Sequence, residues 1–154
     1  MFKTDYSVIL DDNLIFRAPK EERDLVKGIA REQYGLLWDY AKELIKSNPN
    51  STIRMNTIPM SESPPQFKRF YVCLNACKRG SKAGCRPLFG LDGCFLKGYY
   101  GGKLLSVVGQ DGNNQIFVTA YAIVDVENKD NWKWFWELLY ADLGNYEHNG
   151  WNFI

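Results

Sequence analysis

The segment from Gln115 to Val126 constrains the fold most, because its side chains alternate between two faces that are both mostly apolar. One face carries Ile116, Val118, Ala120, Ala122, Val124 and Val126, and the other carries Phe117, Thr119, Tyr121, Ile123 and Asp125. Successive side chains of a strand point to opposite faces, so this pattern predicts one long strand with protein packed on both sides. The chain is therefore expected to contain a sheet covered by other layers.

Two shorter apolar runs precede this strand and supply its neighbours. Residues Pro87 to Leu91 and Leu104 to Val108 have the length and composition of buried strands. Turn residues separate the three runs, at Tyr99 to Gly102 and at Gln110 to Asn114. Because the connections are short, the three strands are expected to form an antiparallel meander.

A helix and a further strand follow the meander. Apolar residues at helical spacing define the buried side of the helix, and they are Trp132, Phe135, Trp136, Leu139 and Leu143. Asn128 or Asp130 is expected to cap its start, and Gly144 its end. The apolar run from Trp151 to Ile154 then predicts a strand that returns parallel to the sheet through a right-handed crossover.

The part before the meander is predicted to be helical with one linker. A helix is expected from near Lys20 to Ser47, where Pro49 prevents its continuation. Residues Asn50 to Gln66 are rich in proline and small polar residues, which is typical of a linker. A short helix, closed by Gly80 and Gly84, is expected to follow. Its apolar residues at helical spacing are Phe67, Phe70, Tyr71, Leu74 and Cys77.

Composition limits the class of protein. The chain has 154 residues, of which 45% are hydrophobic, enough to bury a core of ordinary size. Nineteen Lys and Arg against eighteen Asp and Glu leave a net charge of +1, so any attraction to nucleic acid must be local. Residues Met1 to Phe16 lack the continuous apolar region of a signal peptide, so a soluble intracellular protein without a membrane partner is expected.

Several motifs resemble a known family in order and spacing. They are Phe70-Tyr71-Val72-Cys73, Gly84-Cys85-Arg86-Pro87, Gly90-Leu91-Asp92-Gly93-Cys94, Gly109-Gln110-Asp111-Gly112 and Asn131-Trp132-Lys133-Trp134-Phe135. Together with Leu37-Trp38-Asp39-Tyr40 in the helical part, they resemble the plant-type Mutator-like (MULE, MuDR) transposases over roughly residues 17 to 154. The resemblance implies an incomplete RNase H-like core of the α+β class, with a three-stranded meander, a crossover helix and the start of a fourth, parallel strand. It divides the chain into a helical segment with linker, residues 1–66, and a transposase domain, residues 67–154.

The resemblance also implies an activity and a site. Such transposases cut DNA in the nucleus with two aspartates and a glutamate that hold Mg²⁺ or Mn²⁺, which are hard ions that prefer oxygen ligands. Asp92 matches the first aspartate, at the end of the first strand before a turn at Gly93. The second aspartate is expected one Ser beyond Ile154, and the glutamate later still. One carboxylate cannot hold two metal ions, so this chain alone is expected to be catalytically inactive.

Basic residues supply candidate DNA contacts. Six Lys and Arg fall within residues 68–86 without one acid, and Lys97 follows. The candidates for phosphate binding are Lys78, Arg79, Lys82, Arg86 and Lys97. A solvated helix face is the competing interpretation, and the net charge near zero slightly favours it. Asp125 and Glu127 are interpreted as solvated rather than as substitute metal ligands, and the cysteine spacings do not favour zinc.

Two further hypotheses remain open from the sequence. In the first, the chain is a DNA-binding or regulatory module derived from a transposase. In the second, it is a remnant whose half-core does not fold stably. Whether it associates with an intact transposase is left open.

Overall fold

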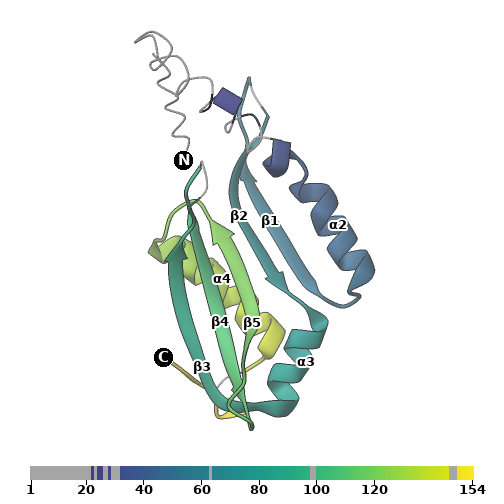
Figure 1. Ribbon diagram of the computed structural model, residues 1–154, viewed down its shortest axis with the longest axis vertical. Coiled ribbons are helices and arrows are strands. Elements are labelled where there is room, and N and C mark those ends of the chain that lie inside the picture. The colour runs from purple at the N-terminus through teal and green to yellow at the C-terminus, as the bar shows by residue number, and fades with distance from the viewer. Residues whose placement is uncertain are drawn as a thin grey trace, which may run out of the picture.

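A six-stranded sheet forms the centre of the computed structural model, which describes residues 22, 24, 25, 28, 32–62, 64–97, 100–145 and 149–154 (Figure 1). The elements used below are α2 (Leu37–Ser47), β1 (Thr52–Ile58), β2 (Gln66–Cys73), α3 (Asn75–Gly84), β3 (Cys85–Phe95), β4 (Lys103–Asp111), β5 (Ile116–Val124), α4 (Lys129–Leu143) and β6 (Asn152–Phe153). The strand order is β1-β2-β5-β4-β3-β6. The chain is therefore a mixed α+β protein, as expected, and its sheet is open.

The predicted meander and the returning strand are confirmed. Strand β4 pairs antiparallel with β3 and with β5, and β6 pairs parallel with β3. Helix α4 lies between β5 and β6 in the chain, which makes it the expected crossover helix. Strand β3 runs to Phe95, four residues beyond the predicted end of the first strand.

Two predictions for the middle of the chain are wrong. The expected linker contains β1, which pairs antiparallel with β2, for example Ile53 opposite Val72. The expected helix from Phe67 is strand β2 up to Cys73, and helix α3 begins only at Asn75. The predicted domain boundary between residues 66 and 67 stays a prediction. Strand β1 lies before this boundary and most of β2 lies after it, and the two strands are paired.

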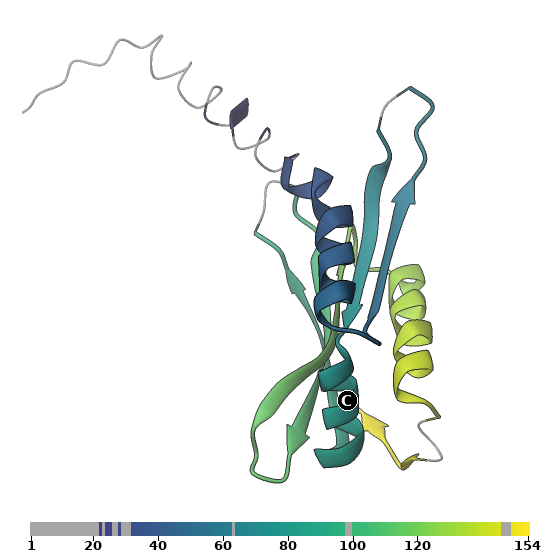
Figure 2. The ribbon, with the colours of Figure 1, turned by 90° about the vertical axis from the view of Figure 1, so that its right-hand side faces the viewer.

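Strand β2 is covered on both faces by different helices. Phe70 and Val72 join a core cluster with Ile53 and Ala41 of α2. Tyr71 and Cys73, on the other face, join a second cluster with Phe135, Leu139 and Leu143 of α4. Figure 2 shows α2 and α4 on opposite sides of the β1–β2 hairpin. The sheet therefore has a helix layer on each side at this strand.

Strand β5 carries an irregularity that changes its predicted faces. Val107 pairs with Ala120 while Val108 pairs with Val118, so Thr119 is an extra residue in the ladder. Ile116 and Val118, predicted to share the buried face of Ala120, are 70% and 46% exposed. The strand also ends at Val124 rather than Val126.

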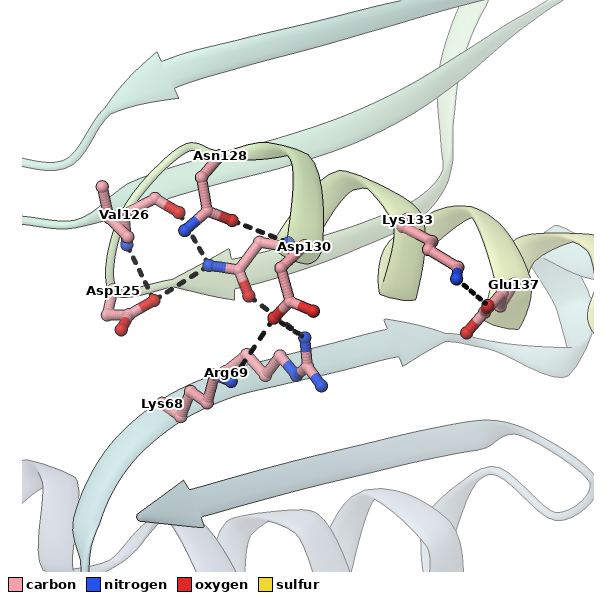
Figure 3. Close-up of polar contacts among 9 residues, drawn as sticks. Lys68, Arg69, Asp125, Val126, Asn128, Asp130, Lys133 and Glu137 are labelled. Atoms are coloured by element: carbon pink, nitrogen blue, oxygen red, sulfur yellow. Dashed lines mark hydrogen bonds and ion pairs between the residues drawn. The ribbon is translucent and has the colours of Figure 1, made fainter.

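Both ends of α4 and the C-terminal end of α2 agree with the sequence, whereas α2 begins at Leu37, after a turn at Leu36 that interrupts the expected helix. Helix α2 ends at Ser47, and α4 ends before Gly144, whose φ of 89° suits glycine. The Asn128 side chain accepts a hydrogen bond from the Asn131 backbone N–H, so Asn128 is the N-cap (Figure 3). The expected helix start near Lys20, the residues before it and Tyr99 of the predicted turn lie outside the described residues. No described helix is long and apolar enough to span a membrane.

Candidate functional site

Asp92 lies inside strand β3 rather than at its end. The strand continues to Phe95, so Gly93 does not form the turn that the sequence suggested. Asp92 is exposed and pairs across the ladder with Ser106 of β4. Because β3 lies between β4 and β6, the carboxylate belongs to an inner strand of the sheet.

The residues next to Asp92 on the adjoining strands are not acids. Ser106 stands opposite Asp92 on β4, and Tyr121 stands opposite Ser106 on β5. Cross-strand partners share one face of a sheet, so a serine and a tyrosine continue the row that begins at Asp92. This row contains one carboxylate.

Glu127 occupies the other face of β3, beside Gly93. A Cβ on Gly93 would lie 2.9 Å from Glu127 Oε1, so the missing side chain makes room for this carboxylate. Glu127 accepts a hydrogen bond from Trp132 Nε1 at 3.2 Å and pairs with Lys103 Nζ at 3.2 Å. The hydrogen bonds from Trp132 and Lys103 lower the pKa of Glu127 below its usual value. The Glu127 carboxylate therefore interacts with Trp132 and Lys103, on the opposite face of β3 from Asp92.

The Asp125 carboxylate is likewise hydrogen-bonded, by groups at the start of α4 and just before it. Its Oδ1 accepts hydrogen bonds from the Val126 backbone N–H at 2.8 Å and from Asn131 Nδ2 at 2.9 Å (Figure 3). Within the part of the chain that the structure describes, no group of three or more His, Cys, Asp or Glu is arranged to hold a metal ion. The four cysteines are free thiols.

Strand β6 runs directly beside the segment of β3 that leads to Asp92. Asn152 pairs with Leu88 and Phe153 with Phe89. The Ile154 N–H donates to the Phe89 carbonyl at 3.0 Å, and the Ile154 carbonyl accepts from the Leu91 N–H at 2.7 Å. These two hydrogen bonds carry the parallel register forward by one residue, so that Ile154 lies beside Gly90.

The predicted basic residues do not form one patch. Lys78 is 17% exposed and forms an ion pair with Asp142, so its ammonium group already has an anionic partner. Arg79, Lys82 and Arg86 are exposed and form no ion pair within the described residues. Lys97 is also exposed, but it lies beyond the far end of β3, whose 11 residues span roughly 36 Å. The three residues near α3 are thus separate from Lys97.

Sequence reasoning missed a buried polar cluster around Asp142. Its carboxylate accepts hydrogen bonds from Thr52 Oγ1 at 2.5 Å and from the Tyr71 hydroxyl at 2.8 Å, beside the ion pair with Lys78. Burial raises the pKa of Tyr71 far above its usual value, and burial raises that of Cys73 to about 12. The sequence contained a signal for this cluster. Asp142 lies three residues after Leu139 on the apolar side of its helix, a position that indicates a buried carboxylate.

Comparison with known proteins gives a family match for the central part of the chain. Residues 88–148 match the family model of the MULE transposase domain, which covers most of β3, all of β4 and β5, and α4. The match supports a transposase-derived protein of the Mutator-like kind, and such a family implies interaction with DNA. Neither the curated proteins nor the solved structures give a match to this chain.

Proposed function

We propose that this chain carries the first part of the RNase H-like catalytic core of a Mutator-like DNA transposase, with Asp92 as the first of its metal-binding acids. The match over residues 88–148 supports the transposase origin. The meander β3-β4-β5, the crossover helix α4 and the parallel strand β6 follow one another in the order that such a core begins with. The proposed activity of such a core is on DNA, in the nucleus.

The single observation that carries this proposal is the register between β6 and β3. Ile154 lies beside Gly90, so in a continued strand the second residue after Ile154 would lie beside Asp92. Parallel strands run about 4.8 Å apart, and residues in register point to the same face. A Ser-Asp pair in this position, as the resemblance implies, would bring a second carboxylate next to Asp92.

The residues of this chain do not fit a pair of divalent metal ions by themselves. Asp92 shares its row with Ser106 and Tyr121, neither of which supplies a carboxylate. Two hard cations held a few ångströms apart require several anionic oxygens to offset their repulsion. We therefore propose that these 154 residues alone do not cleave DNA or transfer its strands.

Mn²⁺ binding to extended chains tests the proposed site. One variant has Ser-Asp appended after Ile154, and its matched control has Ser-Asn. Free Mn²⁺ is measured by electron paramagnetic resonance. We expect tighter binding with Ser-Asp than with Ser-Asn, and loss of the difference when Asp92→Asn is added. Equal binding by the two extended chains would contradict the proposed pairing of carboxylates.

A nicking assay tests the proposed inactivity. Supercoiled plasmid is incubated with the purified chain and Mg²⁺ or Mn²⁺, and the relaxed form is measured on a gel. We expect no relaxation above that of the Asp92→Asn variant. Metal-dependent nicking that disappears in Asp92→Asn would show that these 154 residues assemble an active site.

A DNA-binding or regulatory module is the second candidate function. Arg79, Lys82 and Arg86 favour it, because these residues are exposed and form no ion pair within the described part of the chain. Phosphate contacts require such accessible cations. Lys78 does not support it, since its charge is already matched by Asp142.

A further inference from the structure

An open groove of about 720 Å³ lies between the start of α2, the β1–β2 hairpin and residues 100–102. Helix α2 runs alongside the hairpin here (Figure 2). Tyr34 and Trp38 line it from the helical section, Met55 and Phe67 from the hairpin, and Tyr100 from the segment before β4. Asp92 is not among its lining residues, so the groove is separate from the candidate catalytic site.

Four of the described residues that line the groove are aromatic, namely Tyr34, Trp38, Phe67 and Tyr100. The Tyr34 ring meets Phe67 at 5.1 Å between ring centroids and 70° between planes, and it meets Tyr100 at 5.3 Å and 86°. Trp38 follows Tyr34 by four residues, about one helical turn, and is 54% exposed. The face of an aromatic ring carries partial negative charge, so the exposed Trp38 ring can attract a cation, whereas Tyr34, Phe67 and Tyr100 pack edge to face against one another.

Asp125 is the only charged residue among the described residues that line the groove. Its Oδ1 accepts two hydrogen bonds, whereas its Oδ2 has neither a hydrogen bond nor an ion pair among the described residues (Figure 3). The nearby basic side chains of Lys68 and Arg69 pair instead with Asp130, at 3.4 and 3.1 Å. The groove therefore combines aromatic walls with one negative charge that no described basic residue neutralises.

These features select among possible occupants. Asp125, together with the absence of Lys and Arg from the described lining residues, opposes binding of a phosphate backbone. An unmodified lysine ammonium is strongly hydrated and has three donors to satisfy, which a mainly apolar wall does not do. A trimethylated ammonium keeps its charge, presents methyl groups and has no N–H to satisfy. It therefore matches both the rings and the carboxylate.

We propose that the groove binds a peptide segment that contains a trimethylated lysine. The trimethylammonium group lies against the ring faces of Trp38 and its neighbours, and Asp125 supplies the opposite charge. The groove is much larger than this group alone, so the apolar residues that flank the lysine in the peptide contact Met55 and Phe67. This site is independent of the proposed catalytic core.

Calorimetric titration of the full chain with three short peptides tests the proposal. The peptides are otherwise uncharged and differ at one position, which is trimethyllysine, lysine or norleucine. Norleucine keeps the alkyl chain and removes the charge. We expect the trimethyllysine peptide to bind about tenfold more tightly than either of the others.

Matched variants locate the binding. Trp38→Leu keeps an apolar side chain and removes the indole ring, and Asp125→Asn keeps the Oδ1 acceptor and removes the charge. Each is expected to weaken binding of the trimethyllysine peptide by about tenfold. Phe95→Leu is the control, because Phe95 is 77% exposed and lies outside the groove, and it should leave the affinity unchanged. Circular dichroism melts verify that each variant folds.

Several results would overturn the proposal. Equal affinity for the trimethyllysine and norleucine peptides would exclude recognition of the cation. Unchanged affinity in folded Trp38→Leu and Asp125→Asn chains would exclude the groove. Free tetramethylammonium that binds as tightly as the peptide would exclude a peptide ligand, and displacement of the peptide by a single-stranded oligonucleotide would indicate a nucleic-acid site instead.

Discussion

Lys78 Nζ lies 2.6 Å from Asp142 Oδ1, in an ion pair whose side chains are only 17% and 6% exposed. Lys78 belongs to α3, whereas Asp142 is near the end of α4. The same carboxylate accepts hydrogen bonds from Thr52 of β1 and Tyr71 of β2. This cluster therefore joins four elements on both sides of the expected boundary at residue 66.

Replacement of Lys78 by methionine should destabilise the protein. The change leaves the Asp142 carboxylate buried without its cation, which costs about 3 kcal/mol of unfolding free energy. Urea denaturation followed by circular dichroism measures the loss. Lys82→Met is the matched control on the same helix, because Lys82 is exposed and forms no ion pair among the described residues, and its effect should stay within about 0.5 kcal/mol. Similar losses in the two variants would argue against a stabilising role for the ion pair.

The four cysteines should react with iodoacetamide at very different rates. Cys94 is exposed and should be alkylated first, whereas Cys73 has no exposed surface. Burial, followed by the nearby Asp142 charge, raises the pKa of the Cys73 thiol to about 12, so little thiolate forms in mildly alkaline buffer. Mass spectrometry of peptides taken at successive times gives the order. Early labelling of Cys73 in the folded chain would disprove this account of its surroundings.

Stability should fall as the pH rises above 9. The Cys73 pKa is raised from 9.0 to about 12 on folding, so the folded state retains the thiol proton more strongly than the unfolded state. The resulting stabilisation is complete below pH 9 and is lost as the pH approaches 12. Urea midpoints measured across this range should decline less steeply for Cys73→Ala. Cys94→Ala should decline like the unaltered chain.

Alanine at Gly102 should be more damaging than alanine at Gly101. Both residues have positive φ, 98° and 64°, which disfavours any side chain. A Cβ at Gly102 would also lie 2.8 Å from the Val124 carbonyl oxygen, whereas one at Gly101 meets open space. Gly101→Ala should cost about 1 kcal/mol and Gly102→Ala at least about twice as much. Urea denaturation compares them, and equal losses would show that the contact with Val124 does not matter.

The proposed DNA contacts of α3 and the start of β3 should depend on three residues. Replacing Arg79, Lys82 and Arg86 together by glutamine should weaken binding and reduce the slope of log affinity against log salt by about 3. Electrophoretic mobility over a salt series measures both quantities. Lys97→Gln should leave the slope unchanged, since Lys97 lies beyond the other end of β3. No mobility shift at low salt with the unaltered chain would remove the basis for this site.

The part of the fold that the sequence predicted is the part with one clear periodicity. Helix α4 shows a single apolar stripe with a capping Asn128 and a closing Gly144, and its bounds agree. The meander was predicted because turn residues separate its strands. The parallel return of β6 followed from the general rule for a strand after a crossover helix.

The errors lie where the usual signals are ambiguous. In β2, Phe70 and Val72 face one core cluster and Tyr71 and Cys73 the other, so the strand shows no alternation of apolar and polar residues. Its apolar residues matched a helical spacing by coincidence. The extra residue at Thr119 depends on pairing with β4, and the contacts of Lys78 depend on Asp142, 64 positions away in the chain. Such contacts come from tertiary structure and leave little local trace.

The place of β2 in the sheet has a practical consequence for dissecting this protein. Residues 88–148 match the transposase family, yet β5 within that range has β2 as its outer neighbour. A gene segment trimmed to the matched range would leave the β5 backbone without partners on that side and would expose Val124 and Ala122 along a fresh sheet edge. Expression of that segment should therefore yield aggregates. Because β1 pairs with the outer side of β2, a stable segment should begin before Thr52.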